Sequence, residues 1–308
     1  MLQQLPLKCH NKHRFYPNTN TSGACLVHAA ILDSGIRNIC VSHGRFAQDS
    51  SGSTTSGGQT TGSSDDRGWF SRLLGIQTIE PMKASHSSML SDKETVYELC
   101  THDIVPGEMK SYLDLYKSFV SHHGDVCPQA QLIGSWKVVI GNQDQTVHMW
   151  RHSEGYPGLD KSLDLMRSDN NHVHLIEDQS KLCRSRSSII MLPFSFWGEP
   201  KPREPKHIYE MRSYVLKPGT MIEWGNNWAR GITFRRDFNQ DVGGFFSQIG
   251  RLYMVFHFWA YKDLDTRRQI REDTWRKPGW DTNIAYTVPL IYKMENKVMV
   301  PNEFSQLQ

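Results

Sequence analysis

The chain has 308 residues, of which 38% are hydrophobic, and a formal net charge of +3, so its length allows about two domains with sizeable cores. The positive excess falls in residues 1–93, which hold nine Lys/Arg against six Asp/Glu, and the neutral remainder excludes a nucleic-acid-binding protein that works through a basic surface. No apolar run approaches the ~18 residues of a transmembrane helix, and six cysteines without a C-x-x-C pair favour a reducing compartment over a disulfide scaffold.

Residues 1–64 are predicted to be a disordered N-terminal region. The first 48 residues contain five Lys/Arg and a single acid, Asp33, among many Ser, Thr and Asn, a composition typical of a mitochondrial transit peptide. Residues 50–64 are all Ser, Thr or Gly apart from Gln59, which predicts a flexible linker. The alternative for the first segment is a plain disordered tail.

Residues 65–93 are predicted to be a linker or docking segment. A short hydrophobic patch, Trp69, Phe70 and Leu73, follows the pair Asp65-Asp66. This patch either docks on the first folded unit as a short helix or forms a partner motif. The second option arises because Phe70-x-x-Leu73 fits the aromatic-x-x-aliphatic pattern that autophagy Atg8-type proteins bind as an added β-strand.

The rest of the chain contains one pattern twice. Five residues recur 112 positions later in the same order, namely Tyr97, Glu98, Pro106, Gly107 and Met109 as Tyr209, Glu210, Pro218, Gly219 and Met221. A match in register of this kind predicts a duplicated domain of about 110 residues. We place the first repeat at 94–197, a Pro-rich semi-rigid spacer at 198–206, the second repeat at 207–301 and a C-terminal tail at 302–308.

Both repeats read as β-α-β-β-α-β, which is the ferredoxin-like arrangement. In the first repeat the strands are expected at 95–104, 130–140, 144–152 and 188–197, with helices at 107–122 and from 155 to about 186. In the second repeat the strands are expected at 208–216, 242–249, 251–261 and 285–300, with helices at 221–232 and 263–280. The fold class is therefore α+β, with two tandem ferredoxin-like units whose antiparallel sheets carry helices on one face. Trp224 and Trp228 are expected in the core.

Strand 251–261 has two unlike faces. The wholly apolar face, which includes Phe256 and Phe258, is expected to meet the helices. The opposite face carries His257, and the matching face in the first repeat carries His148. We expect these bare faces to stack between the repeats or to pair with another chain.

Glu98 and Glu210 occupy equivalent positions in the opening strands. If they point to the same bare faces, a Glu and a His from each repeat share an enclosed space, and Glu98, Glu210, His148 and His257 become catalytic candidates for acid–base work. The plain alternative is a buried, hydrogen-bonded polar network.

No metal or cofactor site is predicted. The close histidine pairs, His122-His123 and His172-x-His174, read as solvated surface. The sequence has no phosphate loop, no G-x-S-x-G and no dinucleotide fingerprint.

Three long strings, Lys217–Arg230, Gly243–Gly250 and Trp275–Asp281, resemble the NipSnap family, and the resemblance extends over 65–308. It implies ferredoxin-like units of the dimeric α/β-barrel type and mitochondrial residence behind a cleaved N-terminus. The family has been linked to vesicular transport, and its members are described as marking damaged mitochondria by recruiting autophagy receptors and Atg8-type proteins. No enzyme activity is established for it.

Two functions follow as expectations. The first is a non-enzymatic mitochondrial protein-binding scaffold that recruits autophagy or trafficking proteins. It would reside in the matrix or on the inner-membrane face, and on the outer surface after damage, with peripheral membrane association and homo- or hetero-oligomers. The second is a small-ligand-binding protein or monooxygenase-like enzyme that uses the face around His148 and His257. A pocket near His257, between the repeats, would favour the second.

Overall fold

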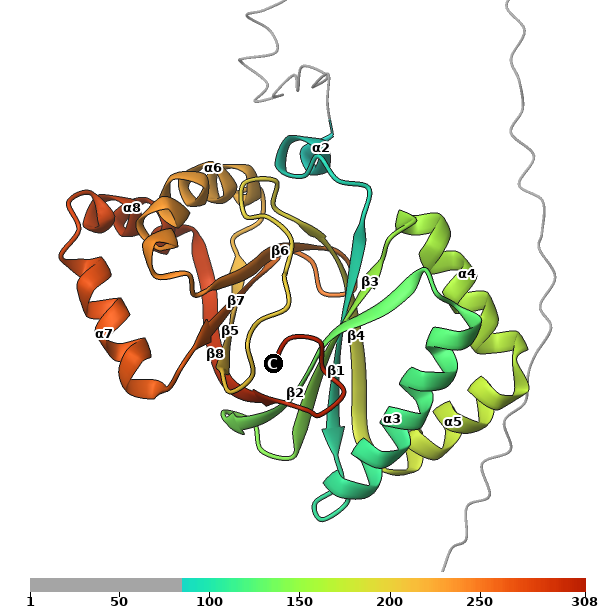
Figure 1. The fold of residues 1–308 in the computed structure, drawn as a ribbon. Helices are drawn as coiled ribbons and strands as arrows, with labels where there is room; N and C mark the ends of the chain where they lie inside the picture. The colour runs from blue at the N-terminus through green and yellow to red at the C-terminus, as the bar shows by residue number, and fades with distance from the viewer. Residues whose placement is uncertain (1–84) are drawn as a thin grey trace, which may run out of the picture. The chain divides into compact units, whose positions relative to one another are not determined.

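A computed structural model describes residues 85–308 (Figure 1). The N-terminal region 1–64, expected to contain a transit peptide, and the expected partner motif of Trp69, Phe70 and Leu73 lie outside the described residues. A short helix, α2 (His86–Leu90), precedes the first repeat. The first repeat consists of β1 (Val96–Ile104), α3 (Met109–Val126), β2 (Ala130–Ile140), β3 (Gln145–His152), α4 (Gly155–Ser168), α5 (Asn170–Lys181) and β4 (Cys183–Pro193).

The second repeat has the same order of elements. It consists of β5 (Ile208–Leu216), α6 (Met221–Gly231), the 3-10 turns η1 (Ile232–Phe234) and η2 (Arg236–Phe238), β6 (Asp241–Ile249), β7 (Met254–Tyr261), α7 (Leu264–Trp275), α8 (Trp280–Thr287), η3 (Val288–Leu290) and β8 (Ile291–Pro301). In both repeats a Pro-Gly turn follows the opening strand, with Gly107 and Gly219 at positive φ. The predicted β-α-β-β-α-β order is confirmed, but two boundaries were wrong. β4 begins at Cys183, inside the expected helical region that ran to 186, and α8 occupies Trp280–Thr287, where the last strand was expected to begin at 285.

The eight strands form one closed antiparallel barrel in the order β1-β3-β2-β8-β5-β7-β6-β4. Each repeat contributes a four-stranded ferredoxin-like sheet, and the two sheets join at their edges. The joints pair β2 with β8, at Trp136 and Pro301, and β4 with β6, at Leu192 and Phe246. Closure leaves no free sheet edge. The helices of the two repeats lie on opposite sides of the barrel (Figure 1).

The barrel interior is filled by apolar and aromatic side chains from all eight strands. One core cluster includes Tyr97, Trp136, Tyr209, Phe245 and Phe258, and the rings of Trp136 and Phe258 stack with centroids 5.6 Å apart. Gly134 makes room for this packing, because a Cβ at that position would lie 1.9 Å from the Trp136 ring. The interior is therefore a packed core.

The assignment of strand faces from sequence was wrong. Phe256 and Phe258 point into the barrel, whereas Trp259 packs with Trp224 and Trp228 beneath the helices of the second repeat. The wholly apolar face turns inward because only other strands can reach it there, and they offer no polar partners. Trp224 and Trp228 are buried, which confirms them as core.

The two ends of the described chain pack against the barrel unit. Leu90 of α2 is buried over Gly225 of α6. Residues 302–308 fold back on β2, where the Asn302 N–H donates to the Ser135 carbonyl at 2.9 Å. Within residues 85–308, each helix is too short or too polar to cross a membrane.

Candidate functional site

The structure does not bring the four predicted catalytic candidates into one space. His148 on β3 and His257 on β7 are fully buried, each beneath the helices of its own repeat, and the packed barrel interior separates the two sides. Glu98 on β1 and Glu210 on β5 pair with Trp150 and Trp259 of the neighbouring strands. The expected shared enclosure is therefore absent among the described residues. The prediction of a shared enclosure fails because the strand faces that carry the histidines turn towards the helices and not into the barrel interior.

Glu210 forms a buried ion-pair network. Arg267 of α7 donates two N–H···O hydrogen bonds to the Glu210 carboxylate, at 2.9 and 2.7 Å. Arg212 donates a third to the same carboxylate at 3.1 Å. Burial alone would raise the pKa of Glu210, but the Arg267 hydrogen bonds and the Arg212 charge lower the pKa to about 2. This glutamate therefore stays ionised and ties α7 to β5.

His257 lies within an aromatic cage. Its ring is 4.4 Å from Trp197 and 4.5 Å from Trp228, measured between centroids, and neither ring nitrogen has a hydrogen-bond partner among the described residues. Burial, with the charges of Arg212 and Arg235, lowers its pKa well below the ordinary value. His257 is thus a neutral core residue, and the nearby space of about 80 Å³ is lined by Trp224, Trp228 and Trp259 instead.

The first repeat contains a much larger cavity, of about 420 Å³, on its helix side. The strands β1, β3 and β4 form its floor, and α3, α4 and α5 form its walls. Its lining includes Glu98, Cys100, His102, Tyr116, Phe119, His123, Trp150, His152, Ser162, Met166, Ile176, Gln179, Arg186, Ser187 and Ser188. We call this cavity the first-repeat pocket.

Polar groups of the first-repeat pocket connect to a buried network. His102 hydrogen-bonds to the Tyr112 hydroxyl, which lies 2.9 Å from His148 Nε2, and His148 Nδ1 lies 2.9 Å from the Ser135 hydroxyl. Burial and the Arg186 charge lower the pKa of His102 to about 4. His148 does not line the pocket but stacks behind Tyr116, with ring centroids 3.8 Å apart.

Glu98, His152 and Cys100 are further titratable residues of the pocket lining. Glu98 lies 3.6 Å from His152 Nε2, which is too far for a hydrogen bond. Burial, followed by the neighbouring Glu98 charge, raises the pKa of the Cys100 thiol well above its ordinary value, so this cysteine is a poor nucleophile. The sequence analysis missed His102. It shares a strand face with Glu98 and Cys100 through the period-two alternation, which could have identified it.

The two repeats differ in cavity volume because their side chains at equivalent positions differ in size. Positions 112 residues apart carry larger side chains in the second repeat, where Arg212 replaces Cys100 and Tyr214 replaces His102. Trp224 and Trp228 likewise stand where α3 has tyrosines. These side chains occupy the volume that remains open in the first repeat.

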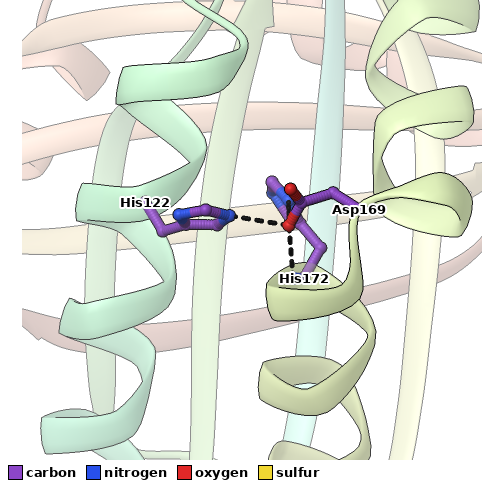
Figure 2. Close-up of side chains that lie close together, drawn as sticks. All are labelled: His122, Asp169 and His172. Atoms are coloured by element: carbon purple, nitrogen blue, oxygen red, sulfur yellow. Dashed lines mark hydrogen bonds and ion pairs between the residues drawn. The ribbon is translucent and has the colours of Figure 1, made fainter.

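A second cluster lies where α5 begins beside α3 (Figure 2). The ligand-type atoms of His122, Asp169 and His172 all lie within 4.8 Å of one another. The expectation that both histidine pairs are solvated surface was wrong, since His123 and His172 are 2% and 0% exposed. It failed because α5 folds back onto α3, a contact that the polar local sequence does not indicate. His174 does face solvent.

Two solved structures of low sequence identity share this architecture over most of their length. A putative monooxygenase from Lactobacillus acidophilus superposes with a TM-score of 0.51 at 10% identity, covering 67% of this chain and 93% of that one. An anthrone oxidase-like protein gives a TM-score of 0.53 at 7% identity, covering 70% and 94%. At such low identity the likeness establishes the fold alone, which is that of the dimeric α/β-barrel proteins.

Sequence relatives are far more similar. Protein NipSnap of Drosophila melanogaster is 47% identical over 251 residues, covering 81% of this chain and 92% of the relative. Human NipSnap homolog 2 is 45% identical, covering 78% and 85%. A putative NipSnap protein of Caenorhabditis elegans is 47% identical, but the chain spans only about half of its length, 47%. A family profile described as NIPSNAP matches residues 209–306. The chain belongs to the NipSnap family.

Proposed function

We propose that this NipSnap-family chain binds a small, partly aromatic ligand in the first-repeat pocket. The observation that carries the proposal is the pocket itself. Its volume, about 420 Å³, falls in the range of about 300–1,000 Å³ typical of small-molecule sites. Tyr116, Phe119 and Trp150 supply an aromatic lining, and Glu98, His102 and Arg186 supply the few polar groups that fix an orientation.

The part of the lining formed by Arg186 suits an acceptor or anionic group of the ligand. The Arg186 guanidinium is a permanent donor, and His102 is neutral at pH 7 because its pKa is about 4. The fold shared with monooxygenase-like proteins supports the further alternative that the bound ligand is oxidised. Ligand binding in the pocket is required whether or not the ligand is then oxidised.

A fluorescent aromatic anion, 8-anilinonaphthalene-1-sulfonate, tests the pocket on the full chain. The substitution His102→Tyr introduces the side chain that the second repeat has at the same position, so it should fill the pocket and weaken one-site binding by about tenfold. The control is Tyr292→Ser, which removes an aromatic that is 79% exposed on β8. Binding unchanged in His102→Tyr, or abolished only in Tyr292→Ser, would contradict the proposal.

A second function, a mitochondrial protein-binding scaffold, is supported by an exposed apolar surface on the second repeat. Three exposed apolar side chains line one hollow: Trp275 at the end of α7, Val288 at the start of η3, and Met294 on β8. Surfaces of this kind mark interaction sites. We propose that the partners are autophagy receptors, Atg8-type proteins or vesicular-transport proteins, as the family resemblance implies.

The location and assembly that go with this scaffold are also proposals. They comprise import through residues 1–64, residence in the matrix or on the inner-membrane face, exposure on the outer surface after damage, peripheral membrane association and oligomerisation. A fluorescent fusion of residues 1–64 tests the first of these. The fusion should label mitochondria, and a cytosolic signal would rule out import by this segment.

The proposed partner motif has its own test. The double substitution Phe70→Ala with Leu73→Ala should abolish pull-down of Atg8-type proteins by the full chain, because both side chains of the pattern are removed. Trp275→Ser is the matched variant for the surface on the second repeat. Retention of binding in the double variant together with loss in Trp275→Ser would move the partner site to the second repeat. Retention in both would remove both surfaces from consideration.

A further inference from the structure

Three side chains of the first repeat converge at the junction of α3 and α5. Asp169 is the N-cap of α5, and its Oδ1 accepts the His172 backbone N–H at 2.8 Å. This cap fixes the first turn of α5, so that His172 Nδ1 lies 3.2 Å from the same oxygen. His122 projects from α3 and brings its Nε2 within 2.8 Å of it (Figure 2).

The spacing of these atoms suits a tetrahedral metal ion. Bonds of about 2.0–2.1 Å to an ion at the centre of a tetrahedron separate neighbouring ligand atoms by about 3.3 Å. The His122–Asp169 and His172–Asp169 separations, 2.8 and 3.2 Å, are close to that value. The second carboxylate oxygen of Asp169, Oδ2, is also available to a metal ion, because the hydrogen bonds from described residues all go to Oδ1.

The surroundings supply what a metal-bound histidine needs. His172 Nε2 lies 2.9 Å from His123 Nδ1, and His123 Nε2 lies 3.2 Å from the Ser162 hydroxyl. With a metal at Nδ1, His172 carries its proton on Nε2 and donates it to His123, which in turn donates from Nε2 to Ser162. Metal-ligating histidines almost always donate their other ring N–H to a fixed acceptor, and for His172 that acceptor is His123 Nδ1.

The solvent exposure of the three residues also allows a metal ion to enter and be held. The His172 ring is fully buried and therefore fixed, whereas the side chains of His122 and Asp169 are 22% and 30% exposed. An ion can enter from solvent and keep one water as its fourth ligand. Two imidazoles and one carboxylate match Zn²⁺, whereas Ca²⁺ and Mg²⁺ prefer all-oxygen ligands.

We propose that His122, Asp169 and His172 bind a divalent transition-metal ion of the Zn²⁺ class, which joins α3 to the start of α5. The ion would lie one histidine away from the first-repeat pocket, because His123 both contacts His172 and lines that pocket. The inference needs no ligand in the pocket and stands whether or not small-molecule binding is found.

The test uses the full chain, stripped with a chelator and titrated with Zn²⁺ against a chromophoric zinc indicator. Because the chain has other histidines and cysteines, the decisive quantity is the difference between variants. Wild type should bind one more tight equivalent than His122→Gln, whose affinity at this site should fall by about tenfold or more. His174→Gln is the matched control, since His174 lies on α5, two residues after His172, but faces solvent.

Two further measurements keep the inference falsifiable if one variant folds poorly. Zn²⁺ should raise the Tm of wild type and of His174→Gln but not that of Asp169→Asn, with helix content checked by circular dichroism. Co²⁺ should give wild type the visible absorption of a four-coordinate ion, and this band should be lost in His122→Gln. Equal Zn²⁺ stoichiometry in wild type and His122→Gln, or loss of the extra equivalent in His174→Gln, would overturn the proposal.

Discussion

His148 and His257 occupy equivalent positions in the central strands of the two repeats, but their rings have different neighbours. His148 is hydrogen-bonded through both nitrogens, to Tyr112 and Ser135 among others. His257 has only aromatic neighbours, with no hydrogen-bond partner among the described residues. A buried polar group without a partner costs free energy, whereas a partnered one does not.

Opposite effects on stability follow for the same substitution. His148→Leu should lower the free energy of unfolding by roughly 2 kcal/mol, because it leaves buried hydroxyls short of a partner. His257→Leu should leave stability unchanged or raise it, because an apolar side chain of similar size suits the aromatic cage better. Urea unfolding of the two variants checks this, and equal losses would contradict it.

Glu210 gives a second prediction at this scale. Glu210→Gln should lower the free energy of unfolding at pH 7 by roughly 3 kcal/mol, because Arg267 and Arg212 would lose their buried counter-charge. The native pKa, about 2, is below the ordinary value of 4.5. The difference in free energy of unfolding between wild type and Glu210→Gln is therefore fully present above pH 4.5, and it is lost as the pH falls towards 2.

The measurement is denaturant unfolding of wild type and variant across that pH range. Glu98→Gln is the control, since Glu98 has the equivalent position but only a long contact, 3.6 Å, to His152. A difference between wild type and Glu210→Gln that stays constant down to pH 2 would show that the ion pair is not the cause.

At the scale of elements, the order of strands and helices could be read from the sequence because turns and periodicity are local. Residue type, alternation and turn residues predicted the existence and order of all eight strands, although the expected starts of β4 and β8 were each about five residues from the observed ones. The alternation of strand 251–261 also predicted two unlike faces. It could not say which face turns inward, because that depends on the other sheet closing the barrel.

Helix packing was the other element-level feature that the sequence did not reveal. Residues 170–181 read as a polar helix, and the period of their few apolar residues gives no sign that His172 lies against His123. The first-repeat pocket was missed for the same reason. Its floor residues were visible as the alternating Glu98, Cys100 and His102, but the helices that cover them could not be placed.

The N-cap of α7 offers a test at this scale. Asp263 Oδ1 accepts the Thr266 N–H at 2.7 Å, and α7 carries the Arg267 that grips Glu210. Asp263→Ala should therefore lower the free energy of unfolding, because the first turn of α7 loses its side-chain cap. Asp265→Ala, which removes only an exposed contact with Arg268, should cost much less. Thermal unfolding of both variants checks this, and equal losses would rule out a capping role.

At the scale of the whole molecule, the two repeats depend on each other. Every strand contributes to a single interior cluster, and the joints β2–β8 and β4–β6 use the outer edges of both sheets. One repeat alone would expose both an apolar face and two unpaired edges. The likeness to monooxygenase-like structures covers about 70% of the chain, which is the barrel as a whole.

Separated repeats should therefore associate. A fragment of residues 207–308, expressed alone, is expected to form dimers or larger assemblies, because Phe256, Phe258 and the edges of β6 and β8 would be exposed. Light scattering after size-exclusion chromatography measures this. A stable monomeric fragment with native circular dichroism would contradict the dependence of each repeat on the other.

The covalent link between the repeats has a consequence for how such a barrel can diverge. In a barrel assembled from two identical chains, each substitution appears twice, so a residue that fills one cavity also fills the other. Here the two halves are encoded separately and meet at a fixed high effective concentration. Trp224 and Trp228 fill the second half, whereas Tyr112 and Tyr116 at the equivalent positions leave a cavity in the first. A substitution in one half of this barrel therefore need not occur in the other half.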